Sequence, residues 1–440
     1  MLLADGEHRA FENRQAGDLK QLSAPAPGTM VARMSSHLTL IHTSDWHLGH
    51  ELSGHSREAE HDLFLAWLIE QLDAEEADVL LVTGDVYDVA NPPVSAMRRL
   101  FGFLREATAR RPGLQVVILG GNHDSAARID LPTALLGDGK VRFIGAFPRR
   151  DGAADCEAVL LPLTGKDGAV AAWLAAVPFC RPGDLGTHSL RSLYAEIIAR
   201  GAARAGGLPL ILSGHLHVAG GEVSDLSERR IVVGGEEAEA STLFDRRAAY
   251  VALGHLHRPQ RVPGEVPIRY AGSPFPLSAT ERGYRHSITR VEISPRGAGI
   301  SEIPIPRPAP FLAVPEGGPA PLDAVVAELA RLEVDDSLSP GLQPFLEISV
   351  LVDGPEPQLQ GRILAALEGK KVRLTRIAKV RAGSGEGDPM AAAGEDLAEL
   401  EPEKVFQALF RREYGDAPPD ALLRAFETLL VQVQTSGEQA

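Results

Sequence analysis

The sequence predicts a layered α/β fold, because short buried strands alternate along the chain with amphipathic helices. Three runs rich in Val, Ile and Leu have the length and the polar or Gly boundaries of buried strands: Leu38–His42, Val79–Thr83 and Gln115–Leu119. Between them lie two helical patterns, Glu58–Leu72 and Val94–Ala109. Strand–helix–strand repetition of this kind is typical of a layered α/β domain.

The helices and the later strands follow from local patterns. In Glu58–Leu72 the apolar residues that recur at helical spacing are Ala59, Leu63, Trp67 and Leu68. Val94–Ala109 starts after a Pro-Pro pair. Further strands are expected at Val159–Leu163, Ala169–Val177, Leu210–Ser213, Ile231–Val233, Tyr250–Leu253, Arg269–Ala271 and Ser287–Ile293.

A Pro-rich connector, Pro304–Pro315, marks the end of this main domain. Beyond it the pattern predicts a small α+β domain with a helix, a strand, a second helix and a second strand, at Pro321–Leu332, Phe345–Val352, Gln358–Leu367 and Val372–Ile377. The Gly/Ser/Glu run Arg381–Asp388 is expected to be a flexible linker. Two amphipathic helices are then predicted near Pro402–Arg412 and Pro419–Val433.

Residues 1–36 are polar and show no apolar periodicity, and they lack the continuous apolar core of a signal peptide. We expect a disordered extension, or an upstream start codon chosen in place of Met34. The two cysteines form no metal-site or disulfide spacing, which fits a reducing cytoplasm. The longest apolar stretch, Ala169–Cys180, is too short to span a bilayer, so no membrane association is expected.

The formal net charge of −15 argues at first against a nucleic-acid partner. The charge is uneven, however, because residues 395–440 carry ten acidic side chains against four basic ones. A metal site also requires carboxylates. Four arginine pairs could supply local positive patches, although each is more often a solvated surface: Arg98-Arg99, Arg149-Arg150, Arg229-Arg230 and Arg246-Arg247. Charge therefore does not exclude a nucleic-acid substrate.

Five short motifs carry the residues expected to perform chemistry, and each follows a predicted strand. They are Ser44-Asp45-Trp46-His47, Gly84-Asp85, Gly121-Asn122-His123-Asp124, Ser213-Gly214-His215 and Gly254-His255-Leu256-His257. The loops at the carboxyl ends of strands in an α/β fold converge on one edge, where ligand sites form. In four motifs Gly precedes the key residue, which allows a tight turn and a close approach of the backbone to an ion.

The residue types suit two adjacent cations, with ligands Asp45, His47, Asp85, Asn122, His215, His255 and His257. Imidazoles mixed with carboxylate and amide oxygens favour Mn²⁺ or Fe²⁺, with Zn²⁺ possible. Asp85 can bridge ions roughly 3.5–4 Å apart, and such a pair assists displacement at phosphorus. The neighbouring His123 is a natural proton donor to the leaving oxygen.

Each motif alone is common, but five in order at strand ends are hard to attribute to chance. Two nearby residues are less clear. His217 repeats the spacing after His215 and is either a surface histidine or a support for a ligand. Asp88 is expected to support a ligand or to face the substrate.

The motifs match in full the pattern Asp-x-His, Gly-Asp, Gly-Asn-His-Asp, Gly-His and Gly-His-x-His, and the chain thereby resembles the calcineurin-like metallophosphoesterase superfamily. Four segments make it similar to one family within it, the bacterial SbcD nucleases, relatives of the eukaryotic and archaeal double-strand-break repair nuclease. These segments are His42–Gly49, Ser56–His61, Pro178–Pro182 and Ala271–Leu277. The resemblance runs from about His37 to the end and weakens after Pro304.

The resemblance implies a four-layered α/β sandwich as the nuclease domain over residues 37–303, a DNA-contacting capping domain over residues 309–381, and a helical tail over residues 395–434 that binds an ABC-type ATPase of the SbcC type. It implies 3′-to-5′ exonuclease and endonuclease activity, including hairpin opening, in double-strand-break processing, replication and recombination. A homodimer within a heterotetramer is the implied assembly.

The resemblance also implies how the ligands divide between two Mn²⁺ ions. One ion would be held by Asp45, His47, Asp85 and His257, and the other by Asp85, Asn122, His215 and His255, with His123 as the catalytic residue. Some non-bacterial members have His in place of Asp88, and the role of that His is not carried over.

Other functions fit parts of the sequence. A small-molecule phosphodiesterase or phosphatase would use the same site, because the ions recognise phosphate rather than DNA; the additional domain and tail argue against it. A catalytically silent scaffold is disfavoured by the intact ligand positions. The apolar faces of the two tail helices could bind the ATPase, or the helices could pack on each other or on their own domain.

Overall fold

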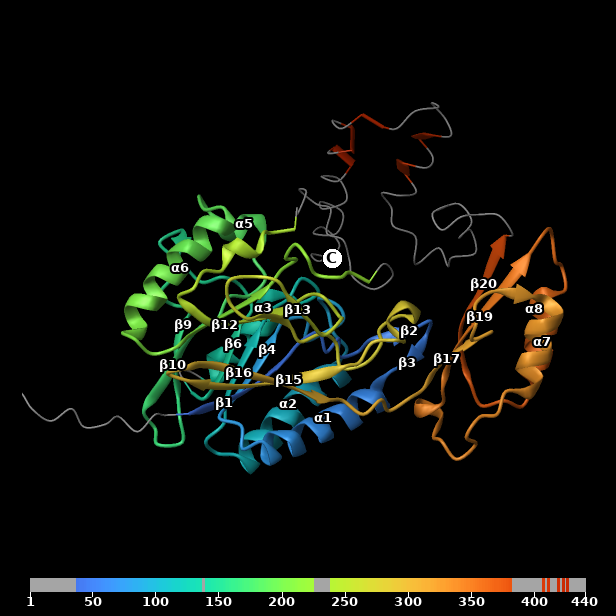
Figure 1. Cartoon of the computed structure of the whole chain (residues 1–440), viewed down its shortest axis with the longest axis horizontal. Helices are drawn as coiled ribbons and strands as arrows, with labels where there is room; N and C mark the ends of the chain where they lie inside the picture. The colour runs from blue at the N-terminus through green and yellow to red at the C-terminus, as the bar shows by residue number, and fades with distance from the viewer. Residues whose placement is uncertain are drawn as a thin grey trace, which may run out of the picture. The chain divides into compact units, whose positions relative to one another are not determined.

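The computed structural model describes residues 37–136, 139–224 and 238–381, and scattered positions between 406 and 426. The extension over residues 1–36, the predicted strand Ile231–Val233, the linker after Arg381 and most of the tail over residues 395–434 lie outside the described residues. The main domain contains two six-stranded mixed sheets (Figure 1).

The first sheet has the order β16-β15-β1-β4-β5-β6. The strands are β1 (Leu38–Thr43), β4 (Val79–Thr83), β5 (Gln115–Leu119), β6 (Val141–Ile144), β15 (Ser287–Ser294) and β16 (Gly297–Pro304). Strands β1, β4, β5 and β6 run parallel, and the β15–β16 hairpin adds antiparallel to β1. The parallel part places the carboxyl ends of β1, β4 and β5 side by side.

The second sheet has the order β13-β14-β12-β11-β10-β9. The strands are β9 (Leu160–Thr164), β10 (Val170–Ala175), β11 (Leu210–His215), β12 (Ala248–Gly254), β13 (Gln260–Val262) and β14 (Ile268–Tyr270). Its central strands β10, β11, β12 and β14 are parallel. The carboxyl ends of β11 and β12 are therefore adjacent as well.

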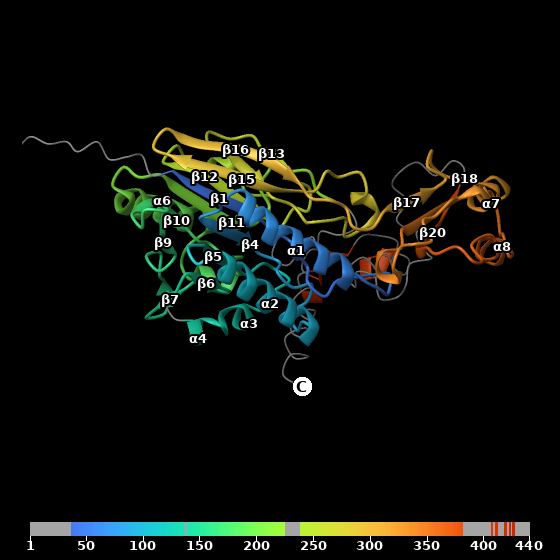
Figure 2. The same cartoon turned by 90° about the horizontal axis from the view of Figure 1, so that it is seen from below.

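Apolar packing between and outside the sheets creates four layers. Leu40 and Leu81 of the first sheet share a buried cluster with Ile211 and Ala252 of the second. Helices α1 (Glu58–Ala74) and α2 (Val94–Arg110), side by side in Figure 2, bury their apolar side chains against the first sheet. Helix α6 (Leu190–Ala205) covers the second sheet. The expected four-layered α/β sandwich is confirmed.

The predicted buried face of α1 is wrong by about one residue. Leu63 is 47% exposed, whereas Phe64, Leu68 and Leu72 are buried. One residue turns a helix by about 100°, so the apolar spacing alone left the orientation of the stripe ambiguous. Helix α6 was not predicted, although Ser189 caps its first turn by accepting a hydrogen bond from the backbone N–H of Ser192.

The remaining elements of the main domain are short. They are β2 (Glu51–Leu52), β3 (His55–Ser56), α3 (Ala126–Asp130), α4 (Thr133–Leu136), β7 (Arg149–Arg150), β8 (Ala153–Ala154), α5 (Pro182–Leu185), η1 (Ser241–Leu243) and η2 (Ala279–Glu281).

A separate four-stranded sheet follows the main domain. The elements are β17 (Phe311–Val314), β18 (Ala320–Pro321), α7 (Leu322–Arg331), η3 (Pro340–Leu342), β19 (Phe345–Val352), α8 (Leu359–Ala366) and β20 (Arg373–Arg381). All of its strands pair parallel to β19, and both helices pack on it through a buried apolar cluster. The predicted helices and strands are confirmed. The connector Pro304–Pro315 is not wholly irregular, because Phe311–Val314 pairs with β19.

In the tail, Phe406 stacks on Phe426 with ring centroids 4.3 Å apart. The two predicted apolar faces therefore touch each other at these residues, as in the alternative to ATPase binding in which the tail helices pack on each other, although Leu422 remains 40% exposed. Among the helices that the structure describes, none has the length and apolar content needed to cross a membrane.

Candidate metal centre

All five motifs meet at the edge where the parallel strands end. Asp45 follows β1, Asp85 follows β4 and Asn122 follows β5. From the second sheet, His215 ends β11, and His255 follows β12. Two sheets, rather than one, therefore supply the cluster.

The backbone is strained at four of the predicted ligands. Asp45, His47, Asp85 and His255 have φ values of 52°, 45°, 46° and 102°. Residues with a Cβ rarely adopt this left-handed region, and such strain persists only where the surrounding structure imposes it, often at functional sites. The turns direct these side chains into the cluster at a cost in local conformational energy.

Glycines around the cluster permit its close packing. A Cβ on Gly121 would overlap the carboxylate and backbone nitrogen of Asp85. A Cβ on Gly84 would overlap the ring of His215, and one on Gly254 would overlap the backbone oxygen of Thr83. Gly at these three positions therefore permits close packing of the motif loops against one another, while the expected approach of the backbone to an ion stays a prediction.

Three histidines are oriented by hydrogen bonds from Nδ1. His47 donates to Asp88 Oδ1 at 3.1 Å, and His215 donates to the carbonyl of Thr83 at 2.8 Å. His257 donates to Glu281 Oε1 at 2.8 Å. With its Nδ1–H engaged, each neutral ring keeps its lone pair on Nε2, the tautomer that a metal ligand needs.

Asp85 lies between His47 on one side and His215 on the other. Its Oδ2 is 3.6 Å from His47 Nε2 and 3.4 Å from His215 Nε2, while its Oδ1 accepts from the backbone N–H of His123 at 2.9 Å. Asn122 Oδ1 lies 2.8 Å from His215 Nε2 and 3.1 Å from His255 Nδ1. One carboxylate thus faces both groups of histidines.

The donor set fits divalent cations. Potential ligand atoms of Asp45, His47 and His257 lie within 4.8 Å of one another, as do those of Asp45, Asp85 and His215. Within the described part of the chain, Asp45 Oδ2 and His47 Nε2 are buried without a hydrogen-bond partner. Buried polar atoms are normally satisfied, so an unpartnered carboxylate oxygen and an unpartnered imidazole nitrogen at this site fit a role as ligands of a divalent cation.

The pKa shifts of the buried side chains also indicate that the cluster favours a positive charge. Burial raises the pKa of Asp45. Burial alone would raise the pKa of Asp85 too, but the neighbouring His215 and His123 hold it well below its usual value. Although burial disfavours the imidazolium, Asp85 and Asp45 raise the pKa of His215 to about 9. The carboxylates therefore retain a proton on His215 unless a metal ion supplies the charge.

His123 lies beside the cluster, and like His215 it is oriented by a backbone carbonyl. Its Nδ1 donates to the backbone carbonyl of Asp88 at 2.8 Å, and its ring centroid is 4.8 Å from that of His47. The carbonyl fixes the ring so that Nε2 is the nitrogen that can exchange a proton with a bound molecule.

Comparison with known proteins gives the family. Residues 38–259 match the model for calcineurin-like phosphoesterases, and residues 307–414 match a domain described as the type 5 capsule protein repressor C-terminal domain. The SbcD subunit of the nuclease SbcCD from Rhodobacter capsulatus is 42% identical over 85% of this chain and 94% of its own length. The chain belongs to the SbcD nuclease family.

Two other SbcD subunits match this chain at lower identity, and one of them matches a smaller share of it. The SbcD subunit from Escherichia coli K12 is 31% identical over 89% of this chain and 98% of its own. The SbcD subunit from Bacillus subtilis is 33% identical over 59% of this chain and 67% of its own. Membership in this calcineurin-like phosphoesterase family confirms the predicted enzyme class, a metal-dependent phosphodiesterase.

Sequence reasoning missed three residues that support the cluster. Glu281 comes from a loop far along the chain. Asp124 accepts from the backbone N–H groups of Gly121, Val86 and Tyr87, and burial together with Asp85 raises its pKa to about 6. His50 is half-buried near Asp88, and loss of solvation lowers its pKa to about 3. The Asp124 bonds join two motif loops, and only its position within a motif pointed to it.

Asp88 and His217, whose roles the sequence left open, differ in their contacts with the cluster. Asp88 supports two histidines, through its carboxylate to His47 and through its carbonyl to His123. Asp88 also shares a potential ligand group with these two histidines. His217 is half-buried and belongs to none of the ligand groups found among the described residues.

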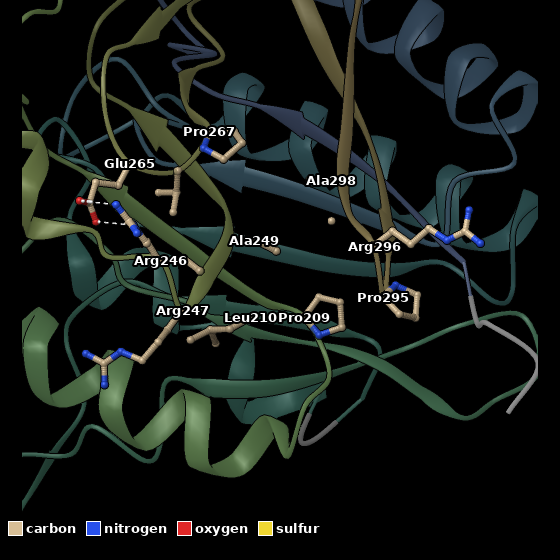
Figure 3. A pocket seen from close by; sticks show the side chains of 13 residues that line it. Pro209, Leu210, Arg246, Arg247, Ala249, Glu265, Pro267, Pro295, Arg296 and Ala298 are labelled. Carbon is tan, nitrogen blue, oxygen red and sulfur yellow. Dashed lines mark hydrogen bonds and ion pairs between the residues drawn. The ribbon is translucent and has the colours of Figure 1, made fainter. Parts of the chain in front are cut away.

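A hollow of about 510 Å³ lies at the opposite edge of the second sheet, beside the first residues of β11 and β12 (Figure 3). Arg246 and Arg247 line it, but Arg246 pairs with Glu265 at 3.3 Å and Arg247 pairs with Asp245. These arginines are bound to surface carboxylates, as the solvated-surface interpretation expects, and they lie away from the metal cluster.

Proposed function

We propose that this chain is a DNA nuclease that uses two Mn²⁺ ions and acts with an ABC-type ATPase, as 3′-to-5′ exonuclease and hairpin-opening endonuclease, in double-strand-break processing, replication and recombination. The observation that carries the proposal is the convergence of five predicted ligands where the parallel strands of both sheets end, with Asp45 Oδ2 and His47 Nε2 buried and without a hydrogen-bond partner; the five are Asp45, His47, Asp85, His215 and His257. The names of the relatives, which are SbcD subunits of the nuclease SbcCD, support the nucleic-acid substrate and the second subunit.

In this proposal one ion would be held by Asp45, His47, Asp85 and His257, and the other by Asp85, Asn122, His215 and His255. Two adjacent divalent cations polarise a phosphoryl oxygen and stabilise the charge that develops during in-line displacement. The combination of imidazole and oxygen donors favours Mn²⁺, with Fe²⁺ and Zn²⁺ as the alternatives.

The protein's own groups supply proton transfer and orientation. His123 would supply the proton that the departing oxygen requires, since the Asp88 carbonyl accepts from its Nδ1 and fixes the orientation of the ring beside the cluster. Asn122 contributes a neutral oxygen, which limits repulsion of the phosphate. The backbone N–H of His123 holds one oxygen of Asp85, so that the other oxygen faces His47 and His215.

We further propose a DNA-contacting role for residues 309–381, ATPase binding by the tail over residues 395–434, and a homodimer within a heterotetramer. The match of residues 307–414 to a family model of their own, separate from that of the phosphoesterase domain, supports a dedicated second module. Cys156 and Cys180 form no disulfide, which is compatible with the cytoplasmic location that we propose.

The metal cluster by itself recognises phosphate, so a small-molecule phosphodiesterase is the competing function, and a silent scaffold is the non-enzymatic one. The test measures Mn²⁺-dependent hydrolysis of hairpin DNA, duplex DNA and bis(p-nitrophenyl) phosphate, with and without an SbcC-type partner. We expect cleavage of hairpin DNA. Hydrolysis of the small ester alone favours the first alternative, and no hydrolysis together with no bound metal favours the scaffold.

A further inference from the structure

A buried carboxylate outside the motifs contacts one of the predicted ligands. Glu281 is fully buried, and its Oε1 accepts the Nδ1 hydrogen of His257 at 2.8 Å. Its second oxygen, Oε2, accepts from the backbone N–H of Leu277 at 2.7 Å. The carboxylate therefore holds the imidazole on one side and its own loop on the other.

The loop that carries Glu281 is wrapped around His257. It connects β14 to β15, and the backbone N–H of Ser273 donates to the carbonyl of His257 at 3.0 Å. Gly272 adopts a φ of +75°, and a Cβ there would lie 2.5 Å from the His257 carbonyl oxygen. His286 donates to the carbonyl of Ser273 at 2.8 Å. The side chain and the backbone of His257 are thus positioned by one segment.

The same loop is anchored where the C-terminal sheet meets the main domain. Arg57 donates to the carbonyl of Pro276, and its guanidinium lies 4.4 Å from the ring centroid of Phe275. The guanidinium also lies 4.8 Å from the ring centroid of Phe345, the first residue of β19. Arg282, next to Glu281, pairs with Glu347 of β19 at 3.5 Å.

A buried charged cluster fixes this junction. Glu60 accepts from Arg57 at 2.7 Å and pairs with Arg373 of β20 at 3.3 Å. The Arg373 guanidinium is 3.6 Å from the ring centroid of Phe345. All four side chains are buried. Removing one partner from such a cluster leaves another charge uncompensated, so the cluster tolerates little displacement of one domain from the other.

We propose that Glu281 is the positioning residue of His257. The junction formed by Arg57, Glu60, Phe345 and Arg373 holds the Glu281 loop in place. The position of the C-terminal sheet against the main domain therefore sets the affinity of the site for metal ions. This inference rests on the proposed function, because it takes His257 as a ligand. A carboxylate bound to Nδ1 fixes the tautomer and makes Nε2 more basic, and loss of such support costs 10–100-fold in metal affinity.

The experiment titrates Mn²⁺ into the full-length chain by calorimetry and follows free Mn²⁺ by electron paramagnetic resonance. Glu281→Gln keeps the shape and loses the charge, and we expect an apparent Kd for one ion raised about 10–100-fold. Excess Mn²⁺ should restore both occupancy and hydrolysis of bis(p-nitrophenyl) phosphate. Glu292→Gln, on the exposed side of β15, is the matched control and should bind Mn²⁺ like the unmodified chain.

The junction is tested with Arg373→Met, for which Arg376→Met, at an exposed position of the same strand, is the control. We expect Arg373→Met to weaken Mn²⁺ binding roughly 2- to 30-fold, the usual range for coupling through a packed network. Combined with Glu281→Gln, it should add little further loss, because both changes act through the same imidazole.

The outcomes are distinguishable. Unchanged Mn²⁺ affinity in folded Glu281→Gln overturns the positioning role, and unchanged affinity in Arg373→Met overturns the coupling to the junction. If Glu281→Gln does not fold, Glu281→Asp, which withdraws the carboxylate by one methylene, should show the same loss of affinity, and normal binding by it overturns the proposal. An unmodified chain that binds no Mn²⁺ contradicts the proposed function itself, and the inference falls with it.

Discussion

The Nε2 atom of His215 lies 3.4 Å from Oδ2 of Asp85, and the two residues come from different sheets, 130 positions apart in the sequence. The same Asp85 oxygen lies 3.6 Å from His47 Nε2 on the other side. Asp85 therefore occupies the position from which one carboxylate can serve two ions, and the first prediction concerns it.

Asp85→Asn should lose at least one of the two ions and all measurable cleavage, because the amide keeps the shape but removes the charge that both cations would share. Metal content of the purified protein, measured by mass spectrometry, is the direct readout. Asp323→Asn, at a position where the carboxylate is 87% exposed, is the control and should retain both ions. Full occupancy in Asp85→Asn would exclude a bridging role.

His123→Gln should retain both ions and bind DNA, while the cleavage rate falls about 10²–10⁴-fold, the usual contribution of general acid–base catalysis. Single-turnover rates and metal content are measured on the same samples. His188→Gln, in the loop before α6, serves as the control. Loss of metal together with activity would show that His123 belongs to the ligands.

Gly121→Ala should destabilise the fold by about 1–3 kcal/mol, the usual cost of overpacking, and displace Asp85, because the added methyl group overlaps its carboxylate. Gly102→Ala in α2 is the matched control, since nothing lies within 4 Å of its added Cβ. A helical Gly→Ala change should stabilise by about 0.5–1 kcal/mol. Urea unfolding and Mn²⁺ titration of both variants check the prediction, and normal metal binding by Gly121→Ala would contradict it.

Stability should fall as the pH drops from about 6.5 towards 4, because burial lowers the pKa of His61 and of His286 to about 4 and that of His42 to about 3. In this window the unfolded chain, with histidine pKa values near 6.5, binds protons that the folded chain does not. Each such histidine contributes a slope of about 1.4 kcal/mol per pH unit.

His61→Gln isolates one of these contributions. Its amide can still donate to the carbonyl of Trp46, which His61 Nε2 contacts at 2.9 Å, but it does not titrate. Urea unfolding in EDTA between about pH 7.5 and pH 5 should show a shallower decline for the variant. Identical slopes would mean that His61 is not buried in its neutral form.

Deleting residues 395–440 should abolish co-purification with an SbcC-type ATPase and leave Mn²⁺-dependent cleavage of single-stranded DNA intact, because the deleted segment contains no predicted ligand. Leu422→Glu is the sharper variant, since this side chain is 40% exposed and the change should block docking without separating Phe406 from Phe426. Undiminished complex formation by both variants would leave the stacked helices with a purely intramolecular role.

The sequence by itself determined the α/β class, the second module and the identity of the clustered side chains. Asp45, Asp85 and Asn122 could be placed together because the carboxyl ends of parallel strands share one edge, a relation that needs no knowledge of strand order. β19 was predicted at its observed bounds, because alternating buried apolar residues report directly on a strand.

Only the tertiary structure decided which residues support that cluster. Glu281 reaches His257 from a loop 24 residues further along the chain, and Arg373 reaches Glu60 across 313 residues. Contacts of this kind depend on how loops and domains pack, and no local periodicity encodes them. The buried face of α1 was misassigned for the same reason. Leu63 and Phe64 are both apolar, and only the packing of the helix against the sheet decides that Phe64 is buried and Leu63 is exposed.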